Sequence, residues 1–563
     1  MKVMTLAAVA AGLAQVAQAD FEINIDPGAQ PIRDARRSTC SPLVGYAGSG
    51  VTIAKGGGSE EYWFVTNRVE MARAMKEAGA WFQRVWGANQ WFARRAPNPY
   101  PADSDDKEIQ KKRKAYRQSS PEAAFRFWKE NGFKVLFTLE TWGGEKSRNE
   151  ILEFVRWIVD NNYKDVVAGF ELGNESYYSP KYPNLAPEWT LIVNEIWKIW
   201  PKVPLGINLC ELFEENPDIE QVRGRMLAAG TIKRDGYFSA CDFNRYSAQF
   251  VTGMSNCIKR ISHVIYHAYG GETPYSCSYY GFRRFRNFCE SFPELKGKKM
   301  WLSEVRLRSG EDMRCQRIFR ESLVMSHYAL TAICQPDMDG FNHHQLYALS
   351  GGLYQSSGSS WALQWRDAGQ EYPDYRSVGR PHLDVGSMGV AYRIITEAIK
   401  GHPIILAHGT SKDRDSEDTF FTSARVMDQV YARRRALKEG KNAPPVAGEV
   451  EWTVLANTKR NELCLLMVNT KGVSETVKIT APEREFAAPT YCTLSCPERF
   501  VDCREIPGEG KPWRQISWED AQCGYATVGM EPYVGMKPSA DTLTVTIDPH
   551  TVQSVTFVTR VKK

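Results

Sequence analysis

Between about Pro42 and Lys400, short apolar runs alternate with amphipathic helical stretches, a rhythm typical of βα units around a parallel sheet. The candidate strands are Leu43–Ala47, Phe82–Trp86, Lys134–Leu139, Val166–Leu172, Leu205–Leu209, His263–Tyr266, Lys299–Ser303 and Gly340–His344. Helical patterns between them include Arg68–Ala78, Glu122–Asn131 and Asn149–Asn161. Eight strands in this rhythm predict a (β/α)8 barrel. A doubly wound sheet is disfavoured, because no G-x-G-x-x-G turn follows the first strand.

Beyond about Pro403 the pattern changes to alternating strands separated by polar turns, which is typical of an antiparallel β-sandwich. The candidate strands are Trp452–Asn457, Leu463–Asn469, Thr476–Ile479, Thr542–Ile547 and Ser554–Val558. Phe21–Ile25 shares their alternation. We therefore expect a barrel over residues 20–402 and a sandwich over 403–563, with 20–41 a candidate to contribute a strand to the sandwich.

The N-terminus has the pattern of a secretory signal peptide. Lys2 precedes an apolar run from Val3 to Ala17, and Ala17-Gln18-Ala19 is a small-x-small cleavage site. We expect cleavage after Ala19 and a secreted or periplasmic mature chain. The first cysteine, Cys40, lies well beyond that point, so no lipid anchor is predicted. No later segment has the roughly 18 uncharged apolar residues that a membrane span needs.

The 13 cysteines permit disulfides in an exported chain, with at least one left unpaired. Cys492, Cys496, Cys503 and Cys523 are the candidate bridged set. A metal site there is the weaker alternative, because no histidine lies among them. The 71 Lys and Arg against 66 Asp and Glu give a net charge of +5, far short of a nucleic-acid footprint. The 16 Trp and 25 Tyr suit a glycan cleft, although a large aromatic core gives the same count.

Polar residues gather where the predicted barrel strands end, which is the face that carries barrel active sites. The fourth strand leads into Asn174-Glu175, and the seventh ends in Glu304. The same face receives residues from other strands: Arg84 from the second, Glu140 from the third, His267 and Tyr269 from the sixth, and His343 and His344 from the eighth. Adjacent histidines on a strand point to opposite sides, so only one of that pair faces the cleft.

Two glutamates at strand ends are what retaining glycoside hydrolysis requires. Arg84 and the Tyr269 hydroxyl would keep Glu304 ionised as nucleophile, whereas Glu175 would be protonated as acid and later act as base. Asn174 would bind a substrate hydroxyl. We expect the two carboxyl groups about 5–5.5 Å apart.

These motifs resemble the clan A glycoside hydrolases, whose acid/base glutamate follows strand four in Asn-Glu and whose nucleophile ends strand seven. Glu171-Leu172-Gly173-Asn174-Glu175 looks most like the heparanase and β-glucuronidase branch, and related xylosidase and arabinofuranosidase families share the layout. His267-Ala268-Tyr269 resembles that branch's His-x-Tyr. The resemblance implies a secreted retaining hydrolase of β-linked glycans, with acidic or sulfated glycans as one option. It implies no cofactor or metal. The insertion from Ser350 to Asp384 fits none of these patterns.

Alternatives remain open for several of these residues. A lone glutamate at a strand end is usually solvated or paired with a base, and Glu171 is interpreted as a structural ion-pair partner. Arg84 is either a core ion pair or the partner of the nucleophile. Candidate substrate-binding or supporting residues are Asn174, Tyr269, His267, Arg84, Glu140, Trp142 and His343. An inactive, carbohydrate-binding or scaffold barrel is the main rival function, and an esterase is disfavoured because no G-x-S-x-G elbow occurs.

Overall fold

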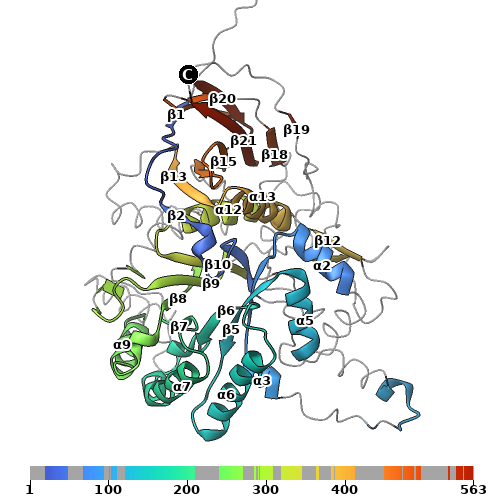
Figure 1. Ribbon diagram of the computed structural model, residues 1–563, viewed down its shortest axis with the longest axis vertical. Coiled ribbons are helices and arrows are strands. Elements are labelled where there is room, and N and C mark those ends of the chain that lie inside the picture. Colours follow the sequence, from blue (N-terminus) through green and yellow to red (C-terminus); the bar gives the residue numbers. More distant parts are fainter. Residues whose placement is uncertain are drawn as a thin grey trace, which may run out of the picture.

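The structure is a computed structural model, and its strands form a barrel beside a β-sandwich (Figure 1). It describes residues 20–47, 68–93, 101, 103–110, 121–209, 240–270, 285–286, 289–290, 292–307, 319–344, 346, 363–366, 382–385, 387–411, 449–471, 473–482, 484–486, 490–495, 531–532, 541–549 and 551–561. The expected signal peptide, residues 1–19, lies outside these ranges. So do Cys496, Cys503 and Cys523 and the side chain of Cys492, so their pairing stays a prediction.

Eight parallel strands close into a barrel, which confirms the predicted (β/α)8 fold. They are β3 (Val44–Ala47), β4 (Phe82–Val85), β5 (Lys134–Leu139), β6 (Val167–Leu172), β7 (Leu205–Asn208), β8 (His263–Gly270), β9 (Lys299–Leu307) and β10 (Met338–His344). Each strand pairs with the next in the chain, and β10 closes the ring on β3. Both β8 and β9 extend four residues beyond their predicted ends.

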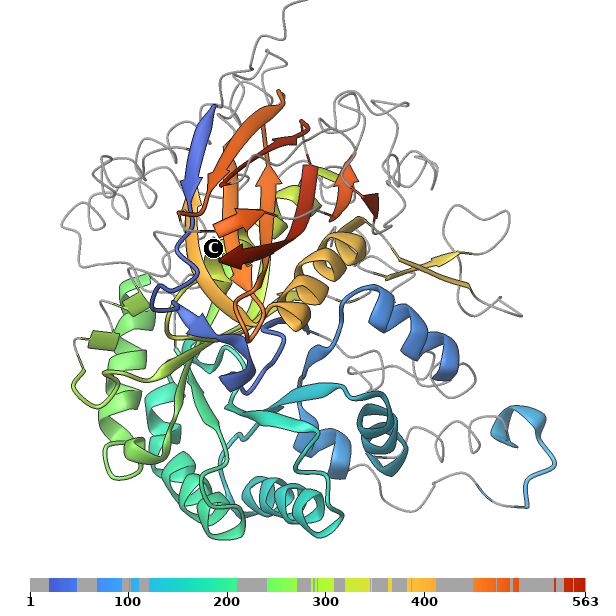
Figure 2. The same cartoon turned by 45° about the horizontal axis from the view of Figure 1, so that its top comes forward.

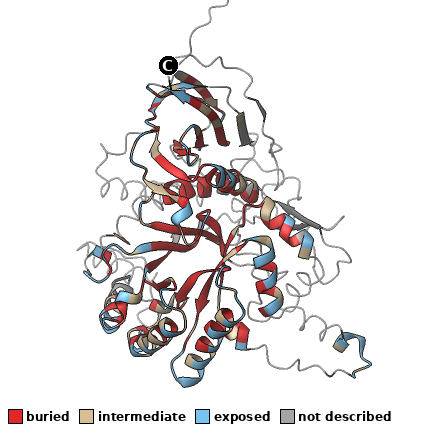
Figure 3. Ribbon diagram, viewed as in Figure 1, coloured by how far each residue is buried: buried red, intermediate tan, exposed pale blue. Residues whose placement is uncertain are grey.

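Helices surround the barrel and turn their apolar stripes inward. Figure 3 shows the result: the outward faces of the helices are exposed and the inward faces are buried. The described helices are α2 (Arg68–Glu77), α3 (Ala88–Ala93), α5 (Pro121–Asn131), α6 (Glu145–Asp160), α7 (Ala186–Ile199), α9 (Ala240–Gly253), α12 (Phe319–Ile333) and α13 (Ser387–Gly401). Short 3-10 turns are η1 (Ala35–Arg37), η2 (Ser176–Tyr178), η3 (Tyr182–Leu185) and η4 (Ile258–Arg260). In α6 the buried positions recur at helical spacing, from Ile151 and Phe154 to Ile158.

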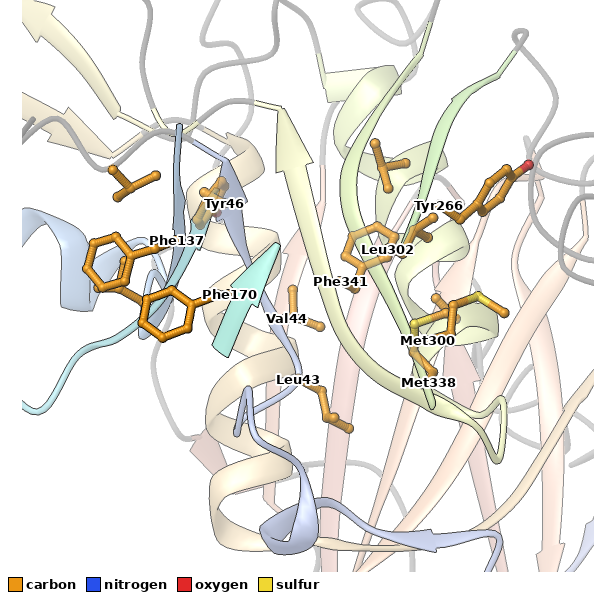
Figure 4. Close-up of a cluster of buried hydrophobic side chains, with 14 of the residues drawn as sticks. Leu43, Val44, Tyr46, Phe137, Phe170, Tyr266, Met300, Leu302, Met338 and Phe341 are labelled. Carbon is orange, nitrogen blue, oxygen red and sulfur yellow. The ribbon is translucent and has the colours of Figure 1, made fainter. Parts of the chain in front are cut away.

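The main core lies between the strands and these helices, where β-branched and aromatic side chains on the outer faces of the strands pack (Figure 4). Phe137 on β5 stacks on Phe125 of α5 with ring centroids 5.2 Å apart, and Phe154 of α6 meets it edge-on at 5.5 Å. Buried aromatic pairs of this kind stabilise beyond their apolar area. The outer layer therefore anchors the strands whose inner faces carry the site.

A sandwich of two sheets accompanies the barrel (Figure 2). The larger sheet contains β2 (Arg33–Asp34), β13 (Ile404–Thr410), β14 (Val450–Ala456), β15 (Glu462–Asn469), β18 (Thr490–Ser495), β19 (Glu531–Pro532) and β21 (Thr551–Val561), with β17 (Arg484–Phe486) paired to β21. The smaller sheet contains β1 (Phe21–Asn24), β16 (Glu475–Thr480) and β20 (Thr542–Ile547). The N-terminal strand β1 runs parallel to β16. A separate apolar cluster, including Ile23, Leu465 and Val545, fills the space between the sheets.

Helices α12 and α13 lie against both parts of the molecule, because each contacts barrel strands and strands of the larger sheet. The barrel and sandwich are thus joined by packed helices as well as by the chain. Within the insertion from Ser350 to Asp384, β11 (Leu363–Arg366) pairs antiparallel with β12 (His382–Val385). Among the helices that the structure describes, none is long and apolar enough to cross a membrane.

Candidate active site

The inside of the barrel has an apolar layer beneath a polar one. Trp301, Phe82, Leu136 and Ile265 form a small buried cluster in the barrel interior. Gly169 and Gly206 leave room for the Trp301 indole, since a Cβ added at Gly169 would lie 2.4 Å from it. Two residues further along each of these strands the inward side chain is polar, because side chains alternate with period two. These polar residues are Arg84, Thr138, Glu171, Asn208, His267 and Ser303.

Glu171 is the centre of the polar layer and is fully buried. Its Oε1 accepts hydrogen bonds from Asn208 Nδ2 at 2.8 Å and Ser303 Oγ at 3.1 Å. Its Oε2 accepts from Arg84 Nε at 2.5 Å and Thr138 Oγ1 at 2.8 Å. Burial alone would raise the pKa of Glu171, but the charge of Arg84 and the bonds from its neighbours lower it. Glu171 is therefore ionised and serves as an ion-pair partner, as its position in the sequence indicated.

Arg84 joins this buried carboxylate to the two predicted catalytic segments. Its side chain is fully buried, and Nη1 donates to Glu304 Oε2 at 3.0 Å while Nη2 donates to Asn174 Oδ1 at 2.6 Å. The planar guanidinium can serve three acceptors at once, which an ammonium at one point could not do in this geometry. Both interpretations of Arg84 from the sequence are thus realised together: it is a core ion pair of Glu171 and a partner of Glu304.

A β-bulge places two consecutive residues of β9 inside the barrel. The register with β8 shifts between Tyr266, opposite Leu302, and His267, opposite Glu304. Regular alternation would send Ser303 and Glu304 to opposite sides, but here Ser303 bonds Glu171 while Glu304 contacts Arg84. The bulge is what allows the seventh strand to supply both a supporting hydroxyl and a carboxylate that contacts Arg84.

A tight turn after β6 turns Asn174 and Glu175 back over the barrel mouth. Gly173 has φ +85°, and a Cβ there would lie 2.6 Å from Ser176 Oγ. Glu175 itself has φ +48°, an uncommon value for a residue with a side chain, and such outliers concentrate at functional sites. Its side chain is 24% exposed, compared with 8% for Glu304. Glu175 is therefore the more solvent-accessible of the two carboxyl groups.

His267 lies between the two predicted catalytic glutamates. Its Nδ1 is 3.1 Å from Glu175 Oε1 and 3.8 Å from Glu304 Oε2, and its Nε2 is 3.0 Å from Ser303 Oγ. Burial would lower the pKa of His267, but its hydrogen bonds to Glu171 and Glu175 and the charge of Glu304 raise it to about 9. The imidazole is therefore cationic at neutral pH and donates from both nitrogens.

Glu304 sits among cations. Burial would raise the pKa of Glu304, but the charges of His344, His267 and Arg84 lower it. His344 Nε2 is 3.8 Å from Glu304 Oε1, on the side away from Arg84. One carboxylate oxygen of Glu304 lies within 4.8 Å of one of Glu175. The arrangement keeps Glu304 ionised next to a second carboxyl group.

The histidine of the eighth strand that faces this pocket is His344. His343, which we expected at the cleft, is fully buried on the outer side, where its ring meets Tyr46 and Tyr392 edge-on. His344 instead stacks on Trp86 with ring centroids 5.7 Å apart and approaches Glu304. The choice within the pair was wrong, because alternation decides only that the two differ and not which one points inward.

The other predicted residues lie around the pocket or outside the described residues. Glu140 is half-buried, accepts a hydrogen bond from Gln90 Nε2 at 3.1 Å and has its backbone N–H bonded to Asn89. Trp142 is 79% exposed in the loop after β5. Tyr269 belongs to β8, but its side chain is not among those that the structure describes, so its bond to the nucleophile stays a prediction.

Sequence reasoning missed Asn208, Thr138 and Ser303 as supporting residues. Asn208 is the last residue of β7, a strand that the sequence did predict. A polar residue at the end of a barrel strand is the signal by which it could have been found. Thr138 and Ser303 carry a weaker signal, namely a hydroxyl two residues beyond an apolar inward position. The trio Glu175, His267 and Glu304 has metal-ligating atom types, but the buried guanidinium of Arg84, which is bonded to Glu304, adds a fixed positive charge that disfavours a metal ion there.

No family model matches the chain, and no curated protein sequence matches it. Solved structures do. An α-L-arabinofuranosidase from Thermotoga maritima in complex with arabinose is 12% identical, covers 96% of this chain and 100% of its own, and has a TM-score of 0.58. A family 51 α-L-arabinofuranosidase from Bifidobacterium longum is 11% identical over 96% and 100% of the two chains, with a TM-score of 0.57. A family 51 arabinofuranosidase from Xanthomonas axonopodis pv. citri is 10% identical over 94% and 98%, with a TM-score of 0.52.

At these identities the likeness shows the fold. The chain shares the barrel-and-sandwich fold of these solved structures along nearly its whole length. The polar layer, with Arg84 between Glu171 and Glu304, is a property of this chain's own residues.

Proposed function

We propose that the protein is a secreted retaining glycoside hydrolase in which Glu304 is the nucleophile and Glu175 the acid/base. The observation that carries the proposal is the approach of a Glu175 oxygen to within 4.8 Å of a Glu304 oxygen beside Arg84. Retaining enzymes hold their carboxyl groups about 5–5.5 Å apart, whereas inverting ones leave about 6.5–9.5 Å for a water. The spacing supports retention.

The charges of the pocket support the division of labour. The charges of His344, His267 and Arg84 hold Glu304 as a carboxylate, and the charge of Arg84 does the same for Glu171. Glu175 has the most exposed side chain of the three carboxyl groups and lies beside the His267 imidazole, so solvent can reach it. Glu175 is thus the carboxyl group suited to give up and regain a proton during the reaction.

The residues then act in two steps. Glu304 Oε1, the oxygen not bonded to Arg84, attacks the anomeric carbon while Glu175 gives its proton to the departing glycosidic oxygen. The bond from the anomeric carbon to that oxygen breaks as the bond to Glu304 forms. In the second step Glu175 takes a proton from water, whose oxygen attacks the same carbon and releases Glu304. Asn174, held by Arg84, is placed to bind a hydroxyl of the reacting sugar.

The substrate class we propose first is β-linked glycans, including acidic or sulfated ones. Arabinofuranosides join the test because the similar solved structures are named as arabinofuranosidases. Trp142, exposed after β5, and Trp86, stacked on His344, are candidate surfaces for the apolar faces of sugar rings.

The experiment is a panel of 4-nitrophenyl glycosides (β-glucuronide, β-xyloside, β-glucoside and α-L-arabinofuranoside) and acidic polysaccharides. It compares the wild type with Glu304→Gln and Glu175→Gln, and with Glu188→Gln as a surface control paired to Arg148. We expect Glu304→Gln to abolish turnover and Glu175→Gln to lower it about 10²–10⁴-fold, least for the best leaving groups. Full activity of both variants on a substrate that the wild type cleaves would refute the assignment.

Azide separates the two roles. In Glu304→Gly, azide replaces the missing nucleophile and should give a glycosyl azide of inverted configuration. In Glu175→Gly, azide attacks the glycosyl-enzyme and should give a product of retained configuration. Proton NMR of the products distinguishes these outcomes, and a reversed result would exchange the two roles. A wild type that binds glycans but cleaves none of the panel would favour the inactive, carbohydrate-binding alternative.

A further inference from the structure

A second group of ligating side chains lies where the barrel meets the sandwich. His327 and Thr331 come from α12 and His408 from β13, while Glu449 immediately precedes β14 and Glu451 lies within it. Figures 1 and 2 show α12 between the barrel and the larger sheet, and it contacts β14 and β15. None of these residues is part of the polar layer around Glu171.

Three of these side chains converge on one point. His327 Nε2 lies 2.9 Å from Glu449 Oε1 and 3.1 Å from Glu451 Oε2, and the three ligating atoms all lie within 4.8 Å of one another. A protonated imidazole nitrogen has a single hydrogen, so it cannot point directly at both carboxylates. The two like-charged carboxylates nevertheless approach the same atom. A cation at the convergence point satisfies all three together.

Because this group of side chains is buried, the net charge of its members affects the stability of the folded protein. The side chains of His327 and Glu451 are fully buried, and that of Glu449 is 8% exposed. Buried carboxylates require compensating positive charge, and His327 and His408 are described residues that can supply it. A divalent cation that replaces the proton of His327 would supply positive charge at the same point and contact both carboxylates as well.

The neighbours of Glu451 orient it as the supporting residues of a metal site do. Thr331 Oγ1 donates to Glu451 Oε1 at 2.7 Å, and His408 Nε2 contacts the same oxygen. Its other oxygen, Oε2, is thereby turned toward His327. Hydrogen bonds to the non-ligating atom of a ligand are the usual means of fixing its orientation.

We propose that His327, Glu449 and Glu451 bind a divalent transition-metal ion, with Zn²⁺ as the best match, at the junction of α12 and β14. Mixed imidazole and carboxylate ligands suit Zn²⁺, whereas Ca²⁺ takes oxygen ligands alone. Tetrahedral ligands at 2.0–2.1 Å from Zn²⁺ are roughly 3.3 Å apart, so each glutamate oxygen needs to separate from His327 Nε2 by only a few tenths of an ångström. Because the ligands are buried away from the catalytic glutamates, the ion's role is to hold the sandwich against the barrel.

The test measures metal content and thermal unfolding of the whole protein. The protein is stripped with a chelator, mixed with one to five equivalents of ZnCl2, desalted and analysed by inductively coupled plasma mass spectrometry. We expect one zinc per wild-type chain and a higher Tm than in the stripped protein. Glu449→Gln and His327→Gln should lose the zinc and the Tm increase. Circular dichroism confirms that each variant is folded, and Glu449→Gln decides alone if His327→Gln does not fold.

The control is Glu175→Gln, because Glu175, His267 and Glu304 form the other described group that could hold an ion. It should retain the zinc and the Tm increase of the wild type. The proposal is overturned if the wild type holds less than about a tenth of an equivalent, if Glu449→Gln binds as much zinc as the wild type, or if Glu175→Gln is the variant that loses it. None of these outcomes depends on glycosidase activity, so the inference and the proposed function fail separately.

Discussion

Replacing Glu171 by glutamine tests whether the polar layer depends on a full negative charge. The carboxylate accepts at both oxygens: Asn208 and Ser303 donate to Oε1, and Arg84 and Thr138 donate to Oε2. A glutamine fits the same volume but has one acceptor oxygen and one donor NH2. In either orientation its NH2 faces one nitrogen donor, Asn208 Nδ2 or Arg84 Nε, that cannot accept a hydrogen bond from it.

The expected loss of stability follows from those contacts. Each buried donor left without an acceptor costs about 1–3 kcal/mol, and removing one member of a buried ion pair costs about 3–5 kcal/mol. The two penalties share the same Arg84 contact and do not add, so we expect Glu171→Gln to lower the free energy of unfolding by about 3–5 kcal/mol. The Glu188→Gln change removes the same charge from a partly exposed pair with Arg148 and should cost about 1 kcal/mol or less.

Urea denaturation monitored by Trp fluorescence and by far-ultraviolet circular dichroism measures both variants. Coincident transitions for the two probes are needed before a free energy is assigned, because a barrel and a sandwich can unfold separately. A Glu171→Gln loss no larger than that of Glu188→Gln would refute the view that a buried charge network organises the site. Failure of Glu171→Gln to fold would agree with it, and Glu171→Asp, which keeps the charge, should then recover folding.

Three further predictions concern the pocket. Gly173→Ala should lower kcat more than Gly132→Ala. Both glycines have positive φ, at +85° and +73°, but only a Cβ at Gly173 meets a neighbouring side chain. Equal effects on kcat would contradict the role of the turn in placing Glu175. The pKa of His267 is raised to about 9 in the folded protein, so the stabilisation of the folded state by the charged imidazole is present below about pH 6.5 and is lost as the pH rises through 9. The urea midpoint of His267→Gln should therefore fall less between pH 7 and 10 than that of the wild type. In His344→Gln the pKa of Glu304 should rise, shifting the acid limb of kcat/KM to higher pH, and an unmoved limb would show that His344 does not act on this carboxylate.

Much of the fold could be predicted because period-two and period-3.6 patterns are local. Strands such as Lys134–Leu139 appear at the predicted residues, and placing Glu175 and Glu304 on the same barrel face needed only the rule for strand ends. What could not be predicted depends on pairing between strands. The bulge beside Ser303 and the inward direction of His344 follow from register with neighbouring strands, which one strand's own pattern does not contain.

The three carboxyl groups of the pocket differ in a way that matches the three roles proposed for them. Glu171 is fully buried and accepts from donors on both oxygens, so its lone pairs are occupied and it is a poor nucleophile. Glu304 keeps one oxygen on Arg84, and His344 approaches the other to 3.8 Å, so the carboxyl group is ionised while that second oxygen accepts no hydrogen bond from the side chains that the structure describes. Glu175 has the most exposed side chain of the three and contacts His267, so it is the carboxyl group that solvent reaches most easily. Decreasing burial thus orders the same functional group from the supporting Glu171, to the proposed nucleophile Glu304, to the proposed acid Glu175.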